Sequence, residues 1–478
     1  MRDSANSWHP REGTVVQAAA QMEPQRERSD VATFVTVYLV LTCAVPSNLT
    51  ISALGTVGRL TTLWALLALV WWVLYQVHRT TPEAVGRRPV RLALALFLAV
   101  AIASYAVAML HGLPDKESSP ADGGLIRLLA WAGILLLIHD GLKNRRGLII
   151  IMRSVVMMGT FTAVLGLLQF VTGASLIDWI TIPGMSSSPD FSNIDVRGGF
   201  VRAAAMASHP LEYGVVLSTS FPIALTLALT QTTRNWLLRW LPVMAIAVAS
   251  VLSVSRSALI AVAIAFVILI PAWSKSMRRR AYVASVGLVG AIYIVTPGLL
   301  GTLRGLFTVG GDDTSITSRT NGYSTALGML ENNPVIGRAF GTFLPEYVIV
   351  DNQYLGLLVE LGVLGLAMFL ALIVSGLTCA WRARHLAVDN DMRQLSQAVL
   401  ASLAAVAVTF AFFDGLSFPM AAAMLFLMLG VAGALWRIVQ EERGGLPVGK
   451  LTAPTIGKTP GFGLLHPYRD GVDDGSNR

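Results

Sequence analysis

The part of the chain best suited to chemistry is the polar segment that runs from Ser315 into the apolar stretch ending at Leu366. It carries Arg319 and Arg338, and it ends in Asp351-Asn352, where the apolar stretch begins. Guanidinium groups bind anionic oxygens in bidentate fashion, and a carboxylate beside them can accept a proton. Long apolar runs flank the segment, so the sequence predicts a folded loop at a membrane surface, suited to chemistry on an anionic lipid head group.

The composition is that of an integral membrane protein. Of the 478 residues, 54% are hydrophobic and 13% are charged, whereas a soluble domain carries about 25% charged residues. Cys43 and Cys379 both lie inside apolar runs, which argues against a disulfide framework. No small-residue cleavage site follows the first apolar run, so this run is predicted to be a membrane span and not a signal peptide.

Apolar runs long enough to cross about 30 Å of hydrocarbon predict an all-α protein of twelve spans, with eleven as the alternative count. They lie near residues 33–54, 60–77, 90–110, 125–139, 148–170, 212–230, 236–254, 257–273, 281–300, 353–380, 396–413 and 418–437. Two long outer loops are predicted at 171–211 and 301–352, the second with a short amphipathic helix. The polar tails, 1–32 and 438–478, are predicted to be disordered and cytoplasmic, which leaves 33–437 as one membrane domain.

The basic residues indicate the orientation. With the N-terminus inside, 27 of the 36 Lys and Arg residues fall on the cytoplasmic side, as the positive-inside rule expects. The net charge of +8 is therefore a topology signal, and no nucleic-acid partner is expected. Both termini are predicted to be cytoplasmic, and both long loops to lie on the outer face of a cytoplasmic membrane. The nine cations that remain outside are Arg59, Lys116, Arg127, Arg197, Arg202, Arg256, Arg304, Arg319 and Arg338.

Two of these outer arginines are predicted to start helices. Arg256 follows Ser255, a favoured N-cap, and Arg319 follows a similar serine-rich stretch. A pair of guanidinium groups beside free helix N–H groups is suited to clamping a diphosphate. The alternatives are a snorkelling interfacial arginine for Arg256 and a loop ion pair with Asp312 or Asp313 for Arg319.

The candidate acid and base residues each have a structural alternative. Asp351 stands at the start of the tenth span, as either a helix N-cap or a general base facing the outer leaflet. Glu360, nine residues deeper and on the opposite face of the helix, is predicted to tie helices together. His209 precedes Pro210, where it either assists an acceptor or caps the next helix. Motifs of metalloproteases, ATPases and serine hydrolases are absent from the sequence, so we expect neither a metal nor a nucleotide cofactor.

At these positions the chain resembles the superfamily of bacterial O-antigen ligases and O-antigen polymerases. The resemblance extends from about 197 to 370 and rests on the order and spacing of four pieces. They are RxxxxxSHPLEYG (Arg202 to Gly214), SRSALIAV at Arg256, SR…LGMLENNPVIGRAFGTF from Ser318, and DNQYLGLLVELGVLGL from Asp351. Members are similar to membrane glycosyltransferases of the GT-C type and take a sugar chain from a polyprenyl diphosphate carrier.

The resemblance implies roles for individual residues. Arg256 and Arg319 stand where the family's diphosphate-binding arginines stand, and Arg202 and Asn352 complete the expected substrate-binding set. The family usually has His-Asn where this chain has Asp351-Asn352, which implies that Asp351 replaces the histidine as base or that the base lies elsewhere, at His209. It tends to have a second glycine where Arg338 stands, which implies an added substrate contact.

The implied function is surface polysaccharide assembly, either polymerisation onto a sugar chain or ligation to a lipid or protein acceptor. The departure at Asp351 slightly favours a polymerase. Expected partners are the lipid-linked oligosaccharide, its acceptor, membrane lipids and other polysaccharide assembly proteins. A transporter or flippase of lipid-linked sugars is the main alternative, although transporters concentrate polar residues near the midplane and this chain concentrates them in its outer loops. A scaffold is a third alternative, but it would leave the outer arginines unexplained.

Overall fold

The fold of the chain is given by a computed structural model. It describes residues 30–78, 88–177, 180, 182–187, 195–197, 200–231, 233, 235–253, 255–295, 326–331 and 333–444. The predicted disordered tails and the segment around Arg319 therefore lie outside the described residues, apart from the few tail positions that belong to the first and last helices.

The described residues are mostly helical. The main helices are α2 (Asp30–Ala44), α3 (Leu60–His78), α4 (Pro89–His111), α5 (Asp115–Gly141), α6 (Arg145–Thr172), α7 (Pro210–Thr230), α8 (Trp236–Leu252), α9 (Arg256–Leu269), α10 (Lys275–Val295), α13 (Gln353–Leu386), α14 (Asn390–Thr409) and α15 (Pro419–Gly444). Short 3₁₀ turns lie at η1 (Ser52–Val57), η3 (Ile270–Ala272) and η4 (Gly415–Ser417). Residues 326–330, where the amphipathic helix is predicted, are also helical.

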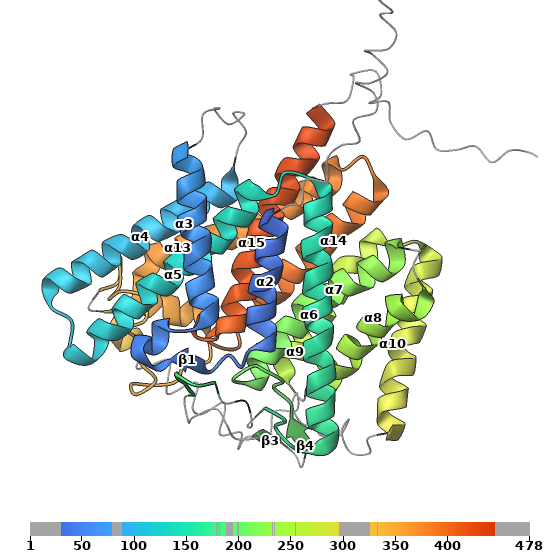
Figure 1. The fold of residues 1–478 in the computed structure, drawn as a ribbon, viewed down its shortest axis with the longest axis horizontal. Helices are drawn as coiled ribbons and strands as arrows, with labels where there is room; N and C mark the ends of the chain where they lie inside the picture. Colours follow the sequence, from blue (N-terminus) through green and yellow to red (C-terminus); the bar gives the residue numbers. More distant parts are fainter. Residues whose placement is uncertain are drawn as a thin grey trace, which may run out of the picture.

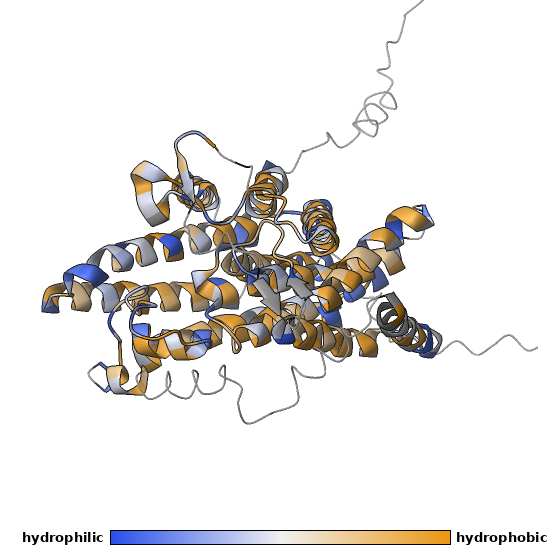
Figure 2. Cartoon of the chain, turned by 90° about the horizontal axis from the view of Figure 1, so that it is seen from below, coloured by the Kyte–Doolittle hydropathy of each residue, from blue (hydrophilic) through white to orange (hydrophobic). Residues whose placement is uncertain are grey.

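Successive helices run up and down through one bundle (Figure 1). We call the end at which β1, β3 and β4 lie, at the bottom of Figure 1, the loop face; α7, α9, α13 and α15 begin there. Figure 2 shows apolar residues along most of the helices. This arrangement follows from the sequence, because apolar segments of this length satisfy their backbone hydrogen bonds internally only as helices.

Each predicted apolar run coincides with one of these helices. By length and composition, seven of the described helices can cross a membrane: α3, α4, α5, α6, α7, α13 and α15. Shorter apolar helices are formed by α2, by α8 and by α9 with η3. These findings support an all-α membrane protein, while the count of twelve spans stays a prediction.

The first predicted run, to residue 54, is too long. Helix α2 ends at Ala44, and the chain passes Pro46, which lacks a backbone N–H and cannot continue a helix. It then forms β1 (Leu49–Ile51), which pairs antiparallel with β2 (Met185–Ser187) from the first long loop. A hairpin joins β3 (Asp195–Arg197) to β4 (Phe200–Arg202). These two pairs of strands are what an all-α prediction leaves out.

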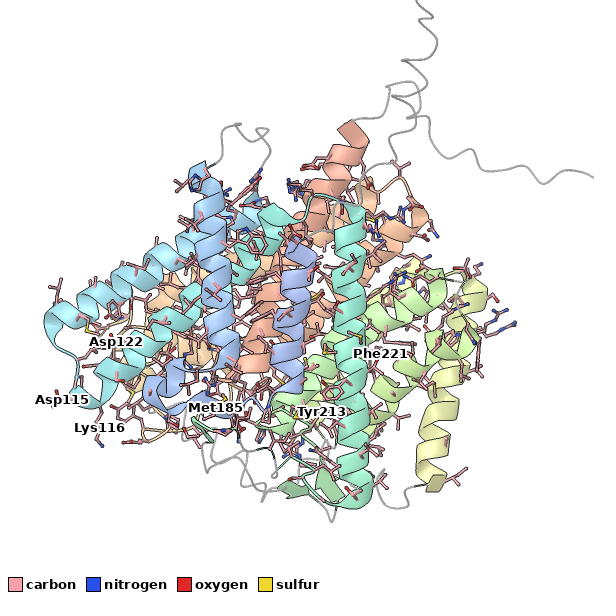
Figure 3. All side chains as sticks on the ribbon, in the orientation of Figure 1. Asp115, Lys116, Asp122, Met185, Tyr213 and Phe221 are labelled. Carbon is pink, nitrogen blue, oxygen red and sulfur yellow. The ribbon has the colours of Figure 1, made fainter. Side chains whose placement is uncertain are left out.

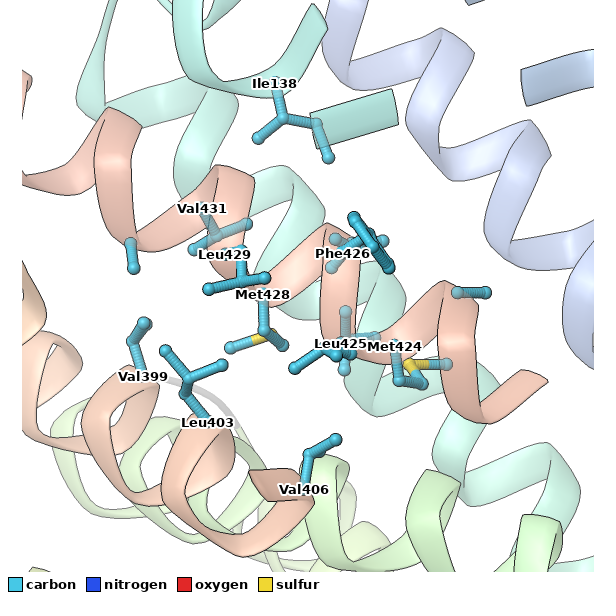
Figure 4. Close-up of a cluster of buried hydrophobic side chains, with 14 of the residues drawn as sticks. Ile138, Val399, Leu403, Val406, Met424, Leu425, Phe426, Met428, Leu429 and Val431 are labelled. Carbon is cyan, nitrogen blue, oxygen red and sulfur yellow. The ribbon is translucent and has the colours of Figure 1, made fainter. Parts of the chain in front are cut away.

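The core is centred on α15, which is buried along most of its length. Figure 4 shows Phe426 of this helix on the side of Ile138 of α5, whereas Leu429 lies on the side of Leu403 of α14. A helix that is apolar on every side has no face for solvent, so it takes the interior of the bundle. Small residues permit the close contacts: a Cβ on Gly430 would lie 2.8 Å from the Leu135 carbonyl oxygen.

Helix α13 is broken at Gly362, which adopts φ +67°. The break frees backbone groups, and the loop before the helix satisfies them: Val363 N–H donates to the Pro334 carbonyl at 2.9 Å, and Leu364 N–H to the Val335 carbonyl at 3.1 Å. In return, Arg338 N–H donates to the Glu360 carbonyl at 2.8 Å. We call residues 333–350 the anchored loop, because the broken helix holds it in place.

Gly362→Ala is expected to lower the melting temperature of the detergent-solubilised protein. A Cβ there would lie 2.3 Å from the Val335 carbonyl oxygen, and the left-handed backbone alone costs about 1–3 kcal/mol for a residue with a side chain. The matched control is Gly356→Ala in the same helix, where only the Gln353 amide nitrogen lies near the added carbon, at 3.9 Å. Equal melting of both variants would contradict the role given to the break.

Candidate functional site

Glu212 organises the loop face. Its side chain is fully buried in the first turn of α7. One carboxylate oxygen accepts hydrogen bonds from the Ser47 hydroxyl at 2.9 Å and the Ser208 N–H at 2.8 Å, and the other accepts from the Met420 N–H at 2.6 Å. Three segments distant in sequence meet in this way: the stretch just after α2, the start of α7 with the loop before it, and the start of α15. A buried carboxylate is tolerated when donors satisfy it in this way.

Arg256 is the first residue of α9, as predicted, and Ser255 is the N-cap. The Ser255 side chain accepts from Ala258 N–H at 3.5 Å, which confirms the predicted cap. The first turns of α9 and α7 pack closely, because a Cβ on Gly214 would lie 2.8 Å from that of Ala258. The half-buried Arg256 therefore lies near the start of α7, whose first turn carries Glu212.

His209 is the N-cap of α7. Its Nδ1 accepts a hydrogen bond from Leu211 N–H at 3.2 Å. The sequence left capping and catalysis open for this residue, and the geometry shows the cap. Because Nδ1 is the acceptor, the proton of a neutral ring is on Nε2, which makes the ring a donor and weakens the case for His209 as a base.

The N-cap of α13 is Asn352, not Asp351. The Asn352 side chain accepts from Tyr354 N–H at 3.0 Å and Leu355 N–H at 3.3 Å. The capping alternative for Asp351 is therefore wrong, because its neighbour occupies the capping position. Asp351 is half-buried just before the helix.

Asp414, between α14 and α15, completes the site, although the sequence interpretation passed it over. The pKa of Asp414 is raised to about 6, mainly by burial and in part by the negative charge of Asp351, while a hydrogen bond with Ser417 acts in the opposite direction. The two carboxylates are thus close enough to interact. The sequence signal that could have identified Asp414 is its position in a connection between two predicted spans on the outer side.

Gln353 fixes the two carboxylates relative to each other. Its N–H donates to the carbonyls of Phe410 at 2.9 Å and Phe413 at 3.2 Å, and its side-chain oxygen accepts from Leu416 N–H at 2.6 Å. The start of α13 is thereby joined to the turn that carries Asp414.

Two aromatic contacts connect this turn with the start of α7. The Phe413 and Phe418 rings are 5.4 Å apart, and Phe418 lies 5.8 Å from the His209 ring. The loop face therefore brings Asp351, Asp414 and His209 into one region, next to the first turn of α9. Tyr213 marks the start of α7 in Figure 3.

Arg338 and Glu360 hold the anchored loop. One terminal nitrogen of Arg338 contacts both carboxylate oxygens of the buried Glu117 of α5, at 2.7 and 2.8 Å. Tyr347 donates to the same carboxylate at 2.7 Å. This pairing occupies the Arg338 guanidinium, so its predicted substrate contact receives no support and stays a prediction.

Glu360 ties the anchored loop to α13, where the sequence predicted a tie between helices. Its carboxylate accepts from Gly341 N–H at 2.9 Å and Phe343 N–H at 3.3 Å.

Arg202 ends β4 and is half-buried at the loop face. Arg319 lies outside the described residues, so its predicted place in the clamp stays a prediction. Among the residues that the structure does describe, no group of three or more His, Cys, Asp or Glu side chains is placed to hold a metal ion.

A comparison with curated proteins found no match. A comparison with protein families matched residues 241–370 to the family described as O-antigen ligase. The match covers α9, the anchored loop and the first half of α13, and with them Arg256, Asp351 and Glu360. This match supports the resemblance of the chain to the O-antigen ligase and polymerase superfamily over residues 241–370.

Proposed function

We propose that this protein is a membrane glycosyltransferase that moves an oligosaccharide from a polyprenyl diphosphate carrier onto an acceptor at the loop face. The observation that carries the proposal is that Arg256, at the first turn of α9, and a carboxylate pair, Asp351 just before α13 and Asp414 before α15, all lie at the loop face (Figure 1). The family match covers the arginine and one of the two carboxylates.

Positive charge at a helix start suits the leaving group. When the anomeric carbon is attacked, the bond to the diphosphate oxygen breaks and negative charge develops there. Arg256, with Arg202 and the predicted contribution of Arg319, is placed to bind those oxygens together with the free N–H groups of α9. The carrier is already activated, so the reaction needs no nucleotide.

The carboxylate pair suits the acceptor. An acceptor hydroxyl must lose its proton as it attacks, and a nearby carboxylate is a competent general base. Asp351 is the proposed base, because it stands where the resembling family usually has a histidine and because Asn352, not Asp351, caps α13. Burial and, after it, the negative charge of Asp351 raise the pKa of the neighbouring Asp414. Asn352, at the same helix start, is the proposed neutral contact to the sugar.

Reconstitution tests the function directly. The full chain in proteoliposomes, supplied with a defined polyprenyl diphosphate oligosaccharide, is expected to release free polyprenyl diphosphate. Longer glycan on the carrier would identify a polymerase, and glycan on an added lipid or protein acceptor a ligase. Movement of intact lipid-linked sugar across the bilayer without release of the carrier would identify a flippase and overturn the proposal.

The proposal places the loop face outside the cytoplasmic membrane, with both termini inside. A cysteine in place of Ser186, exposed in β2, is expected to react with a membrane-impermeant maleimide in intact cells. A cysteine at Ser276, exposed at the opposite end in α10, is expected to react only after the cells are opened. The background is low, since Cys43 and Cys379 are both buried. The reverse pattern would contradict the orientation.

A further inference from the structure

Two arginines outside the proposed clamp share one cleft. Arg59 immediately precedes α3, and Arg127 lies within α5, which packs against α3. The cleft is narrow, with about 10 Å³ of space inside it, and it opens to solvent. The residues lining it include Arg59, Arg127, Tyr38, Thr62, Trp131 and Ser417.

Within the described part of the chain, neither guanidinium has a carboxylate at ion-pair distance. The Nε of Arg59 is buried without a hydrogen-bond partner there. Arg127 donates from Nε to the Gly123 carbonyl at 3.3 Å, and its guanidinium lies 5.7 Å from the centre of the Phe340 ring.

Three other arginines of the bundle behave differently. Arg338 is paired with Glu117, and both Arg88 and Arg91 are paired with Asp140, at 3.1 and 3.2 Å. Arg59 and Arg127 are half-buried, and charges removed from water are normally paired. Two arginines that share a cleft without a carboxylate therefore need an explanation.

The two carboxylates that interact electrostatically with these arginines are already hydrogen-bonded to other groups. Glu212 interacts electrostatically with Arg59, and Glu360 with Arg127. Both carboxylates already accept hydrogen bonds, Glu212 from the serines and Met420 and Glu360 from the anchored loop. Meanwhile Arg59 and Arg127 repel each other. A negatively charged group between them would attract both guanidinium groups and so offset this repulsion.

We propose that Arg59 and Arg127 form a binding site for the phosphate group of a lipid. Two guanidinium forks offer donors to several oxygens at once, which a tetrahedral phosphate can use and a single hydroxyl cannot. The hydroxyl groups of Thr62 and Ser417 line the same cleft. Ser417 bonds to Asp414, so the cleft adjoins the carboxylate pair.

The source of the phosphate is either the lipid-linked sugar or a bilayer phospholipid. Its assignment to the lipid-linked sugar rests on the proposed transferase function, whereas the phosphate site itself does not. The two ideas can therefore fail separately.

Arginine footprinting on the unaltered full chain tests the site. The protein is placed in nanodiscs of phosphatidylcholine and treated with phenylglyoxal, and modified arginines are identified by mass spectrometry. Polyprenyl phosphate added at about ten times its dissociation constant is expected to slow the modification of Arg59 and Arg127 about tenfold, because the slowing scales as one plus the ratio of the lipid concentration to Kd. Equal modification with and without the lipid would overturn the proposal.

A second arm distinguishes the sources. Nanodiscs in which phosphatidylglycerol replaces half of the phosphatidylcholine are expected to protect the pair weakly. Protection equal to that by polyprenyl phosphate would support a phosphate site filled by bilayer lipid. Inorganic phosphate is the probe that lacks a lipid chain. We expect it to protect Arg59 and Arg127 only at concentrations higher than those at which polyprenyl phosphate does.

Variants give an independent measurement. Arg59→Gln and Arg127→Gln are each expected to weaken binding of polyprenyl phosphate about ten- to hundredfold. Lys116→Gln is the matched control, because Lys116 is also at the loop face but is 73% exposed and paired with Glu346. Unchanged binding in both arginine variants would contradict the site. If the unaltered protein did not transfer sugar while polyprenyl phosphate still protected Arg59 and Arg127, the proposed function would be wrong and the phosphate site would remain supported.

Discussion

Arg256→Ala is expected to slow sugar transfer about ten- to hundredfold, because one charge-assisted contact to a charged group contributes roughly 1.5–3 kcal/mol. The protein should remain folded, since the cap of α9 is the Ser255 side chain and alanine is the best helix former. Arg256→Lys should recover little, because an ammonium cannot make the two parallel contacts of a guanidinium.

The measurement is the initial rate of carrier release in proteoliposomes with equal amounts of inserted protein. Lys116→Ala removes a positive charge from the same face at an exposed position and should leave the rate unchanged. If Arg256→Ala transferred sugar at the native rate, the leaving-group role would be wrong. Arg319→Ala is expected to behave like Arg256→Ala, on the strength of the sequence.

Asp351→Ala is expected to reduce transfer about 10²-fold or more, the usual contribution of a general base. The alanine substitution should leave the start of α13 folded, because the capping hydrogen bonds come from Asn352, which is unchanged. Asp115→Ala removes an exposed carboxylate at the start of α5 (labelled in Figure 3) and is the matched control. Native activity in Asp351→Ala would move the proton acceptor elsewhere.

Asp414 supplies the pH dependence of the same step. Its pKa is raised from 3.8 to about 6 by burial and by the charge of Asp351. Transfer should therefore rise as the pH increases through about 6, where Asp414 ionises. Asparagine does not ionise, so Asp414→Asn should lose the midpoint near pH 6. A midpoint unchanged in Asp414→Asn would show that the two carboxylates do not act together.

Stability gives a second readout of Asp414. Its pKa is higher in the folded than in the unfolded chain, so its stabilising effect is fully present below the unfolded value of 3.8 and is lost as the pH rises through about 6. Asparagine resembles the protonated acid and does not ionise. At pH 8, Asp414→Asn should therefore melt at a higher temperature than the native protein while transferring sugar more slowly. Lower stability together with lower activity would indicate a structural carboxylate.

The sequence by itself determined the positions of the helices and of their local caps. Runs of apolar residues specify membrane helices whatever their neighbours, because the backbone must satisfy its own hydrogen bonds in lipid. Ser255 could be assigned as a cap because capping involves only the three residues that follow it. The placement of Arg256 at a helix start followed from the same short-range rule.

Tertiary structure decided which polar residues meet. Arg338 finds Glu117 across 221 positions of sequence, Asp414 comes beside Asp351 because Gln353 holds the two segments together, and Arg59 shares a cleft with Arg127 because α3 packs on α5. The break at Gly362 likewise depends on the loop carbonyls that approach it. Such contacts depend on how the helices pack, and the hydropathy of each helix, which is a local property, does not specify its neighbours.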